Sequence, residues 1–418
     1  MIADTGRRPK ILLFTTINWA STAQLGLALA RQGFQVATMA PFDHGVRKVR
    51  AIAQHFASLS YAASDSYVAR TIMRWEPDFV VPCDDRAVAC LHDVHAQAAR
   101  STGDAWLAIR TTIERSLGDP SAFAIAQKKS KFLAFAQAQG LRVPPTIVVS
   151  DRSQLERALT QISGPYVLKV DGTSSGLGVR IVETPTEARE AYRQLLDLCG
   201  WSRATLRALK TLSLRPLFRH WYEPTAAVTI QPYIEGTPAN RATLCWEGEV
   251  LAGLSVEALR TDGATGPATV VRVVDHPEMA EAARRIVKSL GLSGFIGLDF
   301  IVEAATGRAV LLEMNARPTQ ICHFSLDDAS DMTGTLLARL TGTAKRPVEP
   351  AAGSGVIALF PGESWRDPQS AFLQSCYHDV PLDEPQLVSA YSRPPVAPNP
   401  LAWVSQLCSR VADAFPLL

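Results

Sequence analysis

The stretch GFIGLDFIVEAATGRAVLLEMNARPTQICHF, from Gly294 to Phe324, decides the fold. Two apolar runs are separated by a Thr306-Gly307 turn, a pattern that predicts two adjacent antiparallel strands. Asp299 lies in the first run and Glu313 at the end of the second. Pairing of these strands would set both carboxylates on one face of a sheet, a few ångströms apart.

Buried carboxylates without partners are costly, so a shared cation is the simplest explanation for this acidic pair. Asn315, two residues after Glu313, points to the same face and supplies a neutral oxygen. Asp299, Glu313 and Asn315 therefore form a hard oxygen set that suits Mg²⁺, or Mn²⁺ as the alternative, better than zinc. A surface salt-bridge pair is the competing interpretation. Arg317 follows Asn315 by two residues, and its guanidinium can bind a carboxylate or a phosphate in bidentate fashion.

A second cluster lies upstream in PYVLKVDGTSSGLGVRIV, Pro165 to Val182. Its predicted strand ends in Lys169, and the glycines of the following loop would let backbone N–H groups approach an anion. Alone, the pattern also allows a hairpin with a solvated lysine, and it lacks the residue order of a P-loop. The loop positions of interest are Thr173, Ser174, Ser175, Gly176 and Gly178.

Alternating strand and helix patterns predict a doubly wound parallel α/β domain over residues 1–118. After its last strand come Asp84 and Asp85, which could bind an amino group or cap the next helix. No G-x-G-x-x-G follows the first strand, which disfavours a nicotinamide cofactor. Strands are predicted at 10–14, 34–39 and 78–82, and helices at 23–32 and 87–99.

Residues 119–345 are predicted to form a mixed α+β unit, with a lid-like subdomain over about 145–230. Basic residues recur among leucines in an insert of about residues 198–222. This insert could be a lid, a dimer surface, a membrane-surface helix or a solvated basic face. Helices are predicted at 122–139 and 277–290, and strands at 146–149, 166–170, 179–183, 228–232, 242–246, 250–257, 268–274, 297–303 and 309–313.

Residues 346–418 are rich in proline yet retain aromatic side chains. We expect an ordered accessory segment that wraps the body of the protein, with a disordered tail as the alternative.

The overall composition narrows the class of protein. With 42 Lys and Arg against 40 Asp and Glu, the chain is not built to coat a nucleic acid. No apolar run approaches the ~18 residues that would span a bilayer, so we expect no membrane association. The seven cysteines are scattered and include no C-x-x-C pair, a pattern that favours a reduced cytoplasm.

Five motifs, taken in order, resemble those of the ATP-grasp superfamily of carboxylate–amine ligases over about residues 1–345. They read QKKSKFLAFAQAQGLRVP, PYVLKVDGTSSGLGV, IQPYIEG, GLDFIVE and LLEMNARP. The resemblance implies that a doubly wound N-terminal domain precedes an ATP-grasp fold of two α+β subdomains, which hold ATP between them, with residues 346–418 as a C-terminal extension.

The resemblance also assigns roles to single residues. Asp299, Glu313 and Asn315 match the family's Mg²⁺ ligands, and Arg317 matches a residue beside the transferred phosphate or acyl substrate. Gln231, Tyr233 and Ile234 match the hinge that holds adenine. The residues implied to bind the nucleotide are Lys129, Lys169, Thr173, Ser174, Ser175, Gly176, Gly178, Gln231, Tyr233 and Ile234.

Some positions depart from the family's pattern at the ribose site. Gln231 stands where glutamate is common, and Pro238 replaces an acidic residue that often holds the ribose. Glu235 and Asn240 are candidates to take over that contact.

Two further departures disfavour specific identities. Gly297 stands where D-alanine–D-alanine ligases carry an arginine, and Cys322 stands where biotin carboxylases carry a glutamate. Arg260 and Arg272 are candidates to supply the missing positive charge.

The function that this resemblance implies is an ADP-forming carboxylate–amine ligase. A carboxylate would attack the γ-phosphate to give an acyl phosphate, and an amine would then displace phosphate. We assign catalytic roles to Arg317, Lys169, Arg272 and His323, the last as a base or a substrate contact unless it is merely packed. The alternatives are an ATP-dependent small-molecule kinase and a non-catalytic ATP-binding sensor or partner protein. The expected partners are a small carboxylate and an amine, and a homodimer is an open option. Amino acids are candidate substrates because Arg317 with Asp84 or Asp85 would suit a zwitterion.

Overall fold

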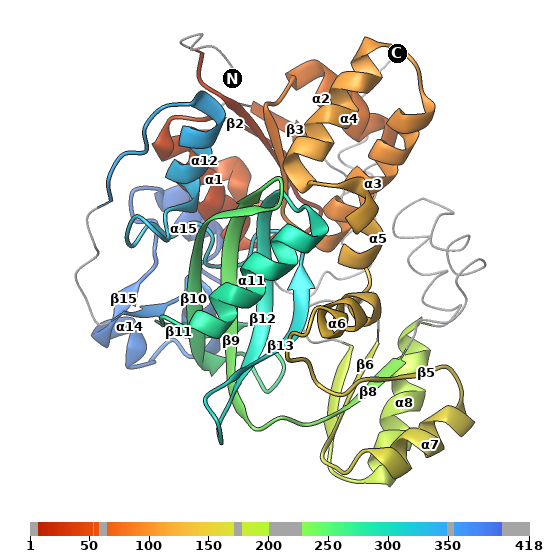
Figure 1. Ribbon diagram of the computed structural model, residues 1–418. Coiled ribbons are helices and arrows are strands. Elements are labelled where there is room, and N and C mark those ends of the chain that lie inside the picture. The colour runs from red at the N-terminus through yellow and green to blue at the C-terminus, as the bar shows by residue number, and fades with distance from the viewer. Residues whose placement is uncertain are drawn as a thin grey trace, which may run out of the picture.

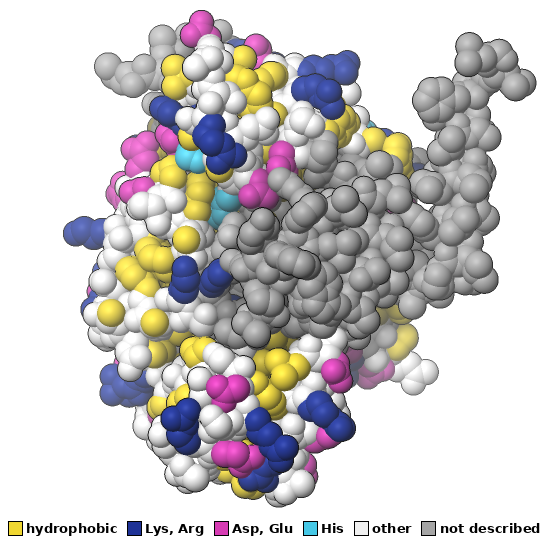
Figure 2. All heavy atoms as spheres, turned by 90° about the vertical axis from the view of Figure 1, so that its right-hand side faces the viewer, with side chains coloured by type: hydrophobic (Ala, Val, Ile, Leu, Met, Phe, Trp, Pro, Cys, Tyr) yellow, Lys and Arg dark blue, Asp and Glu magenta, His cyan; other side chains and the backbone are white. Residues whose placement is uncertain are grey.

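The computed structural model describes residues 7–52, 54–57, 65–170, 178–199, 228–348 and 355–394. These residues form three β-sheets with helices packed on them (Figure 1). Among the described helices, none has the length and apolar character needed to cross a membrane. On the face that Figure 2 shows, the described basic and acidic side chains are interspersed.

The first sheet is parallel and occupies the N-terminal part of the chain. Its strands lie in the order β3 (Gln54–Ala57), β2 (Gln35–Ala40), β1 (Lys10–Phe14) and β4 (Phe79–Pro82). Side chains alternate along β1: Leu12 and Phe14 join one hydrophobic cluster, whereas Ile11 and Leu13 join another. Helices therefore cover both faces of the sheet.

Four helices complete this part of the molecule. Leu12 and Phe14 share their cluster with α2 (Asp65–Trp75), α3 (Asp85–Arg100) and α4 (Asp104–Leu117). On the opposite face Ile11 and Leu13 share theirs with α1 (Ala20–Gln32).

A seven-stranded sheet forms the centre of the protein. Its order is β13 (Ala309–Asn315), β12 (Gly294–Glu303), β9 (Gly236–Trp246), β10 (Glu249–Thr261), β11 (Ala268–Val273), β14 (Val356–Ala358) and β15 (Tyr377–His378). All neighbours pair antiparallel except β14 and β15. One face packs on α11 (Pro277–Leu290), and the other contributes to the cluster that contains α12 (Met332–Thr341).

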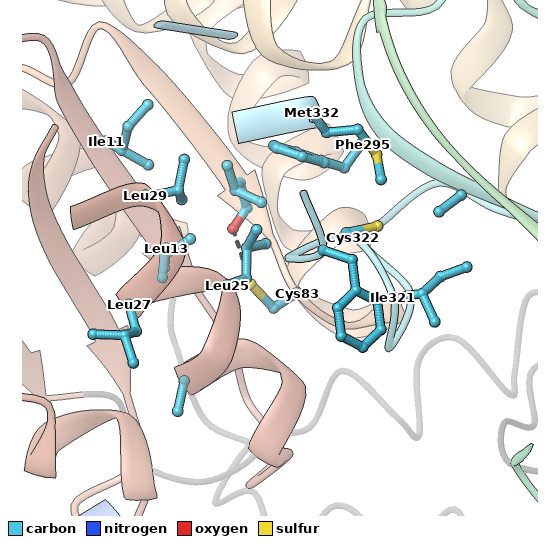
Figure 3. Close-up of a cluster of buried hydrophobic side chains, with 14 of the residues drawn as sticks. Ile11, Leu13, Leu25, Leu27, Leu29, Cys83, Phe295, Ile321, Cys322 and Met332 are labelled. Carbon is cyan, nitrogen blue, oxygen red and sulfur yellow. Dashed lines mark hydrogen bonds between the residues drawn. The ribbon is translucent and has the colours of Figure 1, made fainter. Parts of the chain in front are cut away.

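The parallel sheet and the central sheet share one hydrophobic core. Leu13 and Leu25 from the N-terminal part lie in the same buried cluster as Phe295 and Cys322 from the central part (Figure 3). One face of the parallel sheet therefore shares its core with the central sheet.

The segment after residue 354 adds strands to the central sheet. β14 pairs with β11, and β15 pairs with β14. Two short helices lie between these strands, α13 (Gly362–Arg366) and α14 (Phe372–Ser375), and α15 (Pro385–Ala390) follows β15. Residues 355–394 are thus ordered and continue the sheet, and residues 395–418 lie outside the described ranges.

The third sheet is small and has its own core. Its order is β5 (Ile147–Val149), β8 (Val228–Pro232), β6 (Tyr166–Val170) and β7 (Val179–Val182), all antiparallel. Helices α7 (Arg152–Gln161) and α8 (Pro185–Cys199) pack on it. The loop positions Thr173, Ser174, Ser175 and Gly176 and residues 200–222 of the predicted basic insert lie outside the described residues.

The helix predicted over 122–139 was wrong as a single element. The chain instead forms η2 (Pro120–Ala122), α5 (Phe123–Ala126) and α6 (Lys129–Ala138). Lys128 is extended, with φ −116° and ψ 113°, and this breaks the helix although no glycine or proline is present. The break makes Lys129 the first residue of α6, which packs on the central sheet.

Candidate active site

Asp299 and Glu313 are direct partners across the β12–β13 ladder. Partners in register share a face, so the two carboxylates lie together, as the sequence pattern predicts. On the other side of β12, Asn240 of β9 is the partner of Asp299. Asn240 Nδ2 donates to Asp299 Oδ1 at 2.6 Å, and Asn315 Nδ2 donates to Asp299 Oδ2 at 2.8 Å. Both oxygens of this carboxylate therefore accept a hydrogen bond from an amide.

The first predicted phosphate lysine contacts this acidic pair. Lys129 Nζ lies 2.5 Å from Glu313 Oε2. Burial opposes the charge on Lys129, but the attraction of Glu313, Asp299 and Asp85 raises its pKa above the ordinary value. Lys129 is therefore a fixed positive charge at the start of α6.

The second lysine approaches from the small sheet. Burial lowers the pKa of Lys169, and the positive charge of Lys129 lowers it further, whereas Glu313 and Asp299 oppose the shift. Lys169 is therefore within electrostatic range of all three groups. Two lysines and two carboxylates thus converge from β6, α6, β12 and β13.

The two carboxylates differ in their tendency to hold a proton. Burial raises the pKa of Asp299, and the charge of Glu313 raises it further. Burial also disfavours ionisation of Glu313, but the charges of Lys129 and Lys169 bring its pKa below the ordinary value. The charge of Arg317 opposes the rise in the pKa of Asp299 without overcoming it, whereas two lysine charges act on Glu313.

This donor set fits a magnesium ion. Within the described ranges no group of three or more His, Cys, Asp or Glu side chains gathers to hold a metal. Asp299 and Glu313 with an amide oxygen are a small set of hard ligands, which is what Mg²⁺ takes when phosphate and water oxygens fill its other positions. The amide oxygen of Asn315 accepts a hydrogen bond from Arg317 Nη2 at 3.1 Å, so a cation would have to share this oxygen with Arg317.

Arg317 links this cluster to the N-terminal part of the protein. Its Nε donates to Asp85 Oδ1 at 2.8 Å, and its guanidinium lies 4.8 Å from the ring centre of Trp19. Burial opposes its charge, but Asp85 and Asp299 raise its pKa. The sequence offered Asp84 or Asp85 together with Arg317 as a zwitterion site but could not choose between them, and it gave no signal for the contact with Trp19. Both partners lie more than two hundred residues from Arg317 in the chain.

Asp84 and Asp85 have separate roles despite being neighbours. The buried Asp84 carboxylate accepts from the backbone N–H groups of Arg86 and Ala87, which caps α3. It also accepts from Thr15 and Thr16 in the loop after β1. Asp84 thus serves structure, and only Asp85 faces Arg317.

The predicted adenine hinge lies where β8 leaves the small sheet. Gln231 is buried and its Nε2 donates to Thr146 Oγ1 at 2.7 Å, while Tyr233 is exposed. A hollow of about 430 Å³ opens beside the hinge, in the size range of ligand pockets. It is lined by Arg142, Val143, Pro144, Pro145, Pro232, Tyr233, Ile234, Glu235, Glu303, Ala304, Ala305 and Val310.

The two candidates for the ribose contact separate in the structure. Glu235 lines the hollow at the hinge, whereas the Asn240 amide bonds to Asp299 and accepts from Thr319 Oγ1 at 3.1 Å. Asn240 therefore belongs with the acidic pair, and a sequence signal for this was absent because it depends on how β9 pairs with β12.

The structure does not bring Arg272 and His323 into contact with the acidic pair. Arg272 is exposed on β11, which is three strand spacings from β12, roughly 14 Å. His323 Nε2 lies 3.0 Å from Asp379 Oδ2, and the same carboxylate oxygen accepts from Gln24 Nε2 at 2.8 Å. Asp379 of the C-terminal segment thus bonds both to His323 and to Gln24 of α1.

The acidic pair and Arg317 lie in a segment that matches a known family. A family model described as an ATP-grasp domain matches residues 215–320, which include β8 to β13 and the residues Asp299, Glu313 and Arg317. The chain carries an ATP-grasp domain. No curated protein sequence matches the chain.

Solved structures show that the ATP-grasp fold extends well beyond the matched residues. N5-carboxyaminoimidazole synthetase from Staphylococcus aureus, complexed with ADP, has a TM-score of 0.56 at 13% identity, covering 81% of this chain and 79% of that chain. L-amino acid ligase from Bacillus licheniformis gives 0.54 at 16% identity, covering 82% and 76%. Phosphoribosylamine–glycine ligase from Thermotoga maritima gives 0.55 at 17% identity, covering 82% and 78%.

Proposed function

We propose that this ATP-grasp protein is an ATP-dependent, ADP-forming ligase that joins a small carboxylate to an amine through an acyl phosphate. The observation that carries the proposal is the convergence of Lys129 and Lys169 on Asp299 and Glu313, with Arg317 beside them. Positive charges held next to a metal-binding acidic pair are what phosphoryl transfer from ATP requires.

The lysines have the clearest roles in this scheme. Lys129 and Lys169 would bind phosphate oxygens and stabilise the negative charge that spreads over them during transfer. Mg²⁺ held by Asp299, Glu313 and the Asn315 oxygen would neutralise phosphate charge when bound. The side chains are preorganised, because each lysine is already placed by an ion pair or by nearby carboxylates.

Arg317 would orient the carboxylate that is activated. Its guanidinium is held by Asn315 and Asp85 and lies over Trp19, which restricts its position. A fixed guanidinium aligns a carboxylate through paired hydrogen bonds, and such alignment lowers the barrier to its attack on the γ-phosphate.

The fold relatives support a ligase over the alternatives. Two of them are named as an amino acid ligase and a phosphoribosylamine–glycine ligase, both of which form bonds to nitrogen. The seven scattered cysteines, without a C-x-x-C pair, favour a reducing compartment, and we place the activity in the cytoplasm.

One experiment tests the proposed function. ADP and free phosphate release are measured with Mg²⁺-ATP across a panel of small carboxylates, each with and without amines. Phosphate release that needs both partners is the expected result. ADP without free phosphate would indicate a kinase instead, and no turnover with any pair would indicate a non-catalytic nucleotide-binding protein.

A matched pair of variants makes the result specific. Glu313→Gln removes one carboxylate of the site, whereas Glu249→Gln makes the same change on an exposed position of β10. The proposal requires that the first variant loses activity and the second keeps it.

A further inference from the structure

The ion pair between Asp85 and Arg317 joins two parts of the chain separated by 232 residues. Arg317 is nearly enclosed, with 12% of its side chain exposed, whereas 53% of the Asp85 side chain is exposed. Arg317 supplies the single side-chain partner of the Asp85 carboxylate among the described residues. Asp85 thus presents an acceptor carboxylate to solvent beside a buried guanidinium.

Helix capping does not account for Asp85. The N-cap of α3 is Asp84, whose carboxylate already accepts from two backbone N–H groups. Asp85 is the first residue of the helix, where a negative charge is mildly favourable but no contact with Arg317 is required. The contact across the two parts of the protein therefore needs another explanation.

Arg317 is held on its other sides. Its Nη2 donates to Asn315 Oδ1, and the ring of Trp19 lies against the guanidinium. Asp85 also contributes to the raised pKa of Lys129, so it lies within electrostatic range of the lysine that faces Glu313. The Asp85–Arg317 pair is therefore part of the surroundings of the proposed reaction, on the side formed by the N-terminal domain.

Neighbouring opposite charges on a protein match a ligand that carries opposite charges close together. A zwitterion can replace the single internal ion pair by two, its carboxylate on Arg317 and its ammonium on Asp85. A carboxylate substrate without an ammonium group would occupy Arg317 and leave Asp85 without its partner.

We propose that Asp85 binds the ammonium group of the carboxylate substrate, while Arg317 binds the carboxylate that is activated, so that the substrate is an α-amino acid or a similar zwitterion. The inference rests on the proposed ligase function and adds the class of acid that the site accepts. Asp85 acts as a specificity-determining residue supplied by the N-terminal domain.

The test compares amino acids with their deamino analogues as the acid. Hydroxylamine serves as the common amine, so that each activated acid is trapped as a hydroxamate and the second substrate does not vary. We expect the wild-type protein to favour the amino acids in kcat/KM by about 10- to 100-fold, the range of one charge-assisted hydrogen bond.

Asp85→Asn should lower kcat/KM for the amino acids about 10- to 100-fold more than for the deamino acids, so that the preference disappears. Asp85→Ala should do the same, and a thermal melt of each variant checks that it folds. The matched control is Asp104→Asn, a substitution that makes the same charge change outside the site. Asp104 is the exposed first residue of α4. It should retain the wild-type preference.

The outcomes separate this inference from the proposed function. If the wild type activates acids but Asp85→Asn keeps the preference for amino acids, the inference is wrong and the ligase function stands. If Asp85→Asn slows both classes of acid equally, Asp85 only positions Arg317 and the inference is also wrong. If the wild type activates no acid at all, both proposals fall.

Discussion

Lys129 and Glu313 form a 2.5 Å ion pair between the first residue of α6 and β13 of the central sheet. The pair joins the predicted phosphate lysine to the predicted metal ligand before any nucleotide is bound. Charge balance at this point is therefore built into the protein, and removing either partner takes the nearest opposite charge from a partly buried group.

Glu313→Gln should lower turnover by about two to three orders of magnitude, comparable to the removal of other preorganised electrostatic groups. The variant loses one oxygen charge for the metal and leaves Lys129 without its ion-pair partner. The measurement is the rate of ADP release as a function of Mg²⁺ concentration. A rate close to that of the exposed control Glu249→Gln would exclude Glu313 from the site.

Lys169→Ala should cause a loss of similar size, about two to three orders of magnitude in turnover. The side chain lies at the end of β6, where it is influenced by Glu313, Lys129 and Asp299 together. Steady-state kinetics with Mg²⁺-ATP checks this, and Lys288→Ala on the exposed side of α11 is the matched control. Equal rates in the two variants would contradict a phosphate-binding role for Lys169.

Gly118→Ala should strongly destabilise the junction between the parallel sheet and the central domain. Gly118 has φ +92°, and an added methyl group would overlap the Gly291 carbonyl and lie 2.6 Å from the Ser293 nitrogen. Backbone atoms cannot give way cheaply, so we expect a loss of about 2–4 kcal/mol.

Thermal unfolding measures this loss of stability, and a second glycine with a positive φ serves as the control. Gly263 also has a positive φ, +75°, but a methyl group there would meet nothing within 4 Å. Gly263→Ala should therefore cost only about 1–2 kcal/mol. A Gly118→Ala protein that melts as high as Gly263→Ala would show that the junction is not tightly packed.

Glu363 should make stability depend on pH in the acid range. Burial disfavours its charge, but hydrogen bonds from Arg366, Ser370 and Thr269 lower its pKa from 4.5 to about 2. A depressed pKa in the folded state stabilises the fold above the unfolded value, and this contribution is lost as the pH falls from about 4.5 to about 2.

The expected contribution at neutral pH is about 3 kcal/mol. Glu363→Gln should remove it, so the unfolding midpoints of wild type and variant should differ most above pH 4.5 and converge as the pH approaches 2. Urea unfolding at several pH values checks the prediction. A difference that stays constant across this range would mean that the Glu363 charge contributes nothing.

Much of the fold could be predicted because local patterns and tertiary structure agree. The strands Lys10–Phe14, Tyr166–Val170 and Val228–Pro232 occur with the predicted bounds, as does the helix Pro277–Leu290. Each is an apolar run or an amphipathic segment whose period is set by its own residues. The α6 boundary at Lys129 was missed, because no helix-breaking residue stands there and packing on the central sheet decides the break.

The chain by itself determined that Asp299 and Glu313 lie on two neighbouring strands, because a tight turn joins these strands. A β-bulge between Asp299 and Phe300 then shifts the register, so that Glu313 and not Leu312 is the partner of Asp299. Tertiary structure alone decided that Asn240 bonds to Asp299, that Lys129 reaches Glu313 and that Asp85, not Asp84, faces Arg317. Those contacts join segments far apart in sequence. Their geometry depends on how whole sheets pack against one another, which no local pattern encodes.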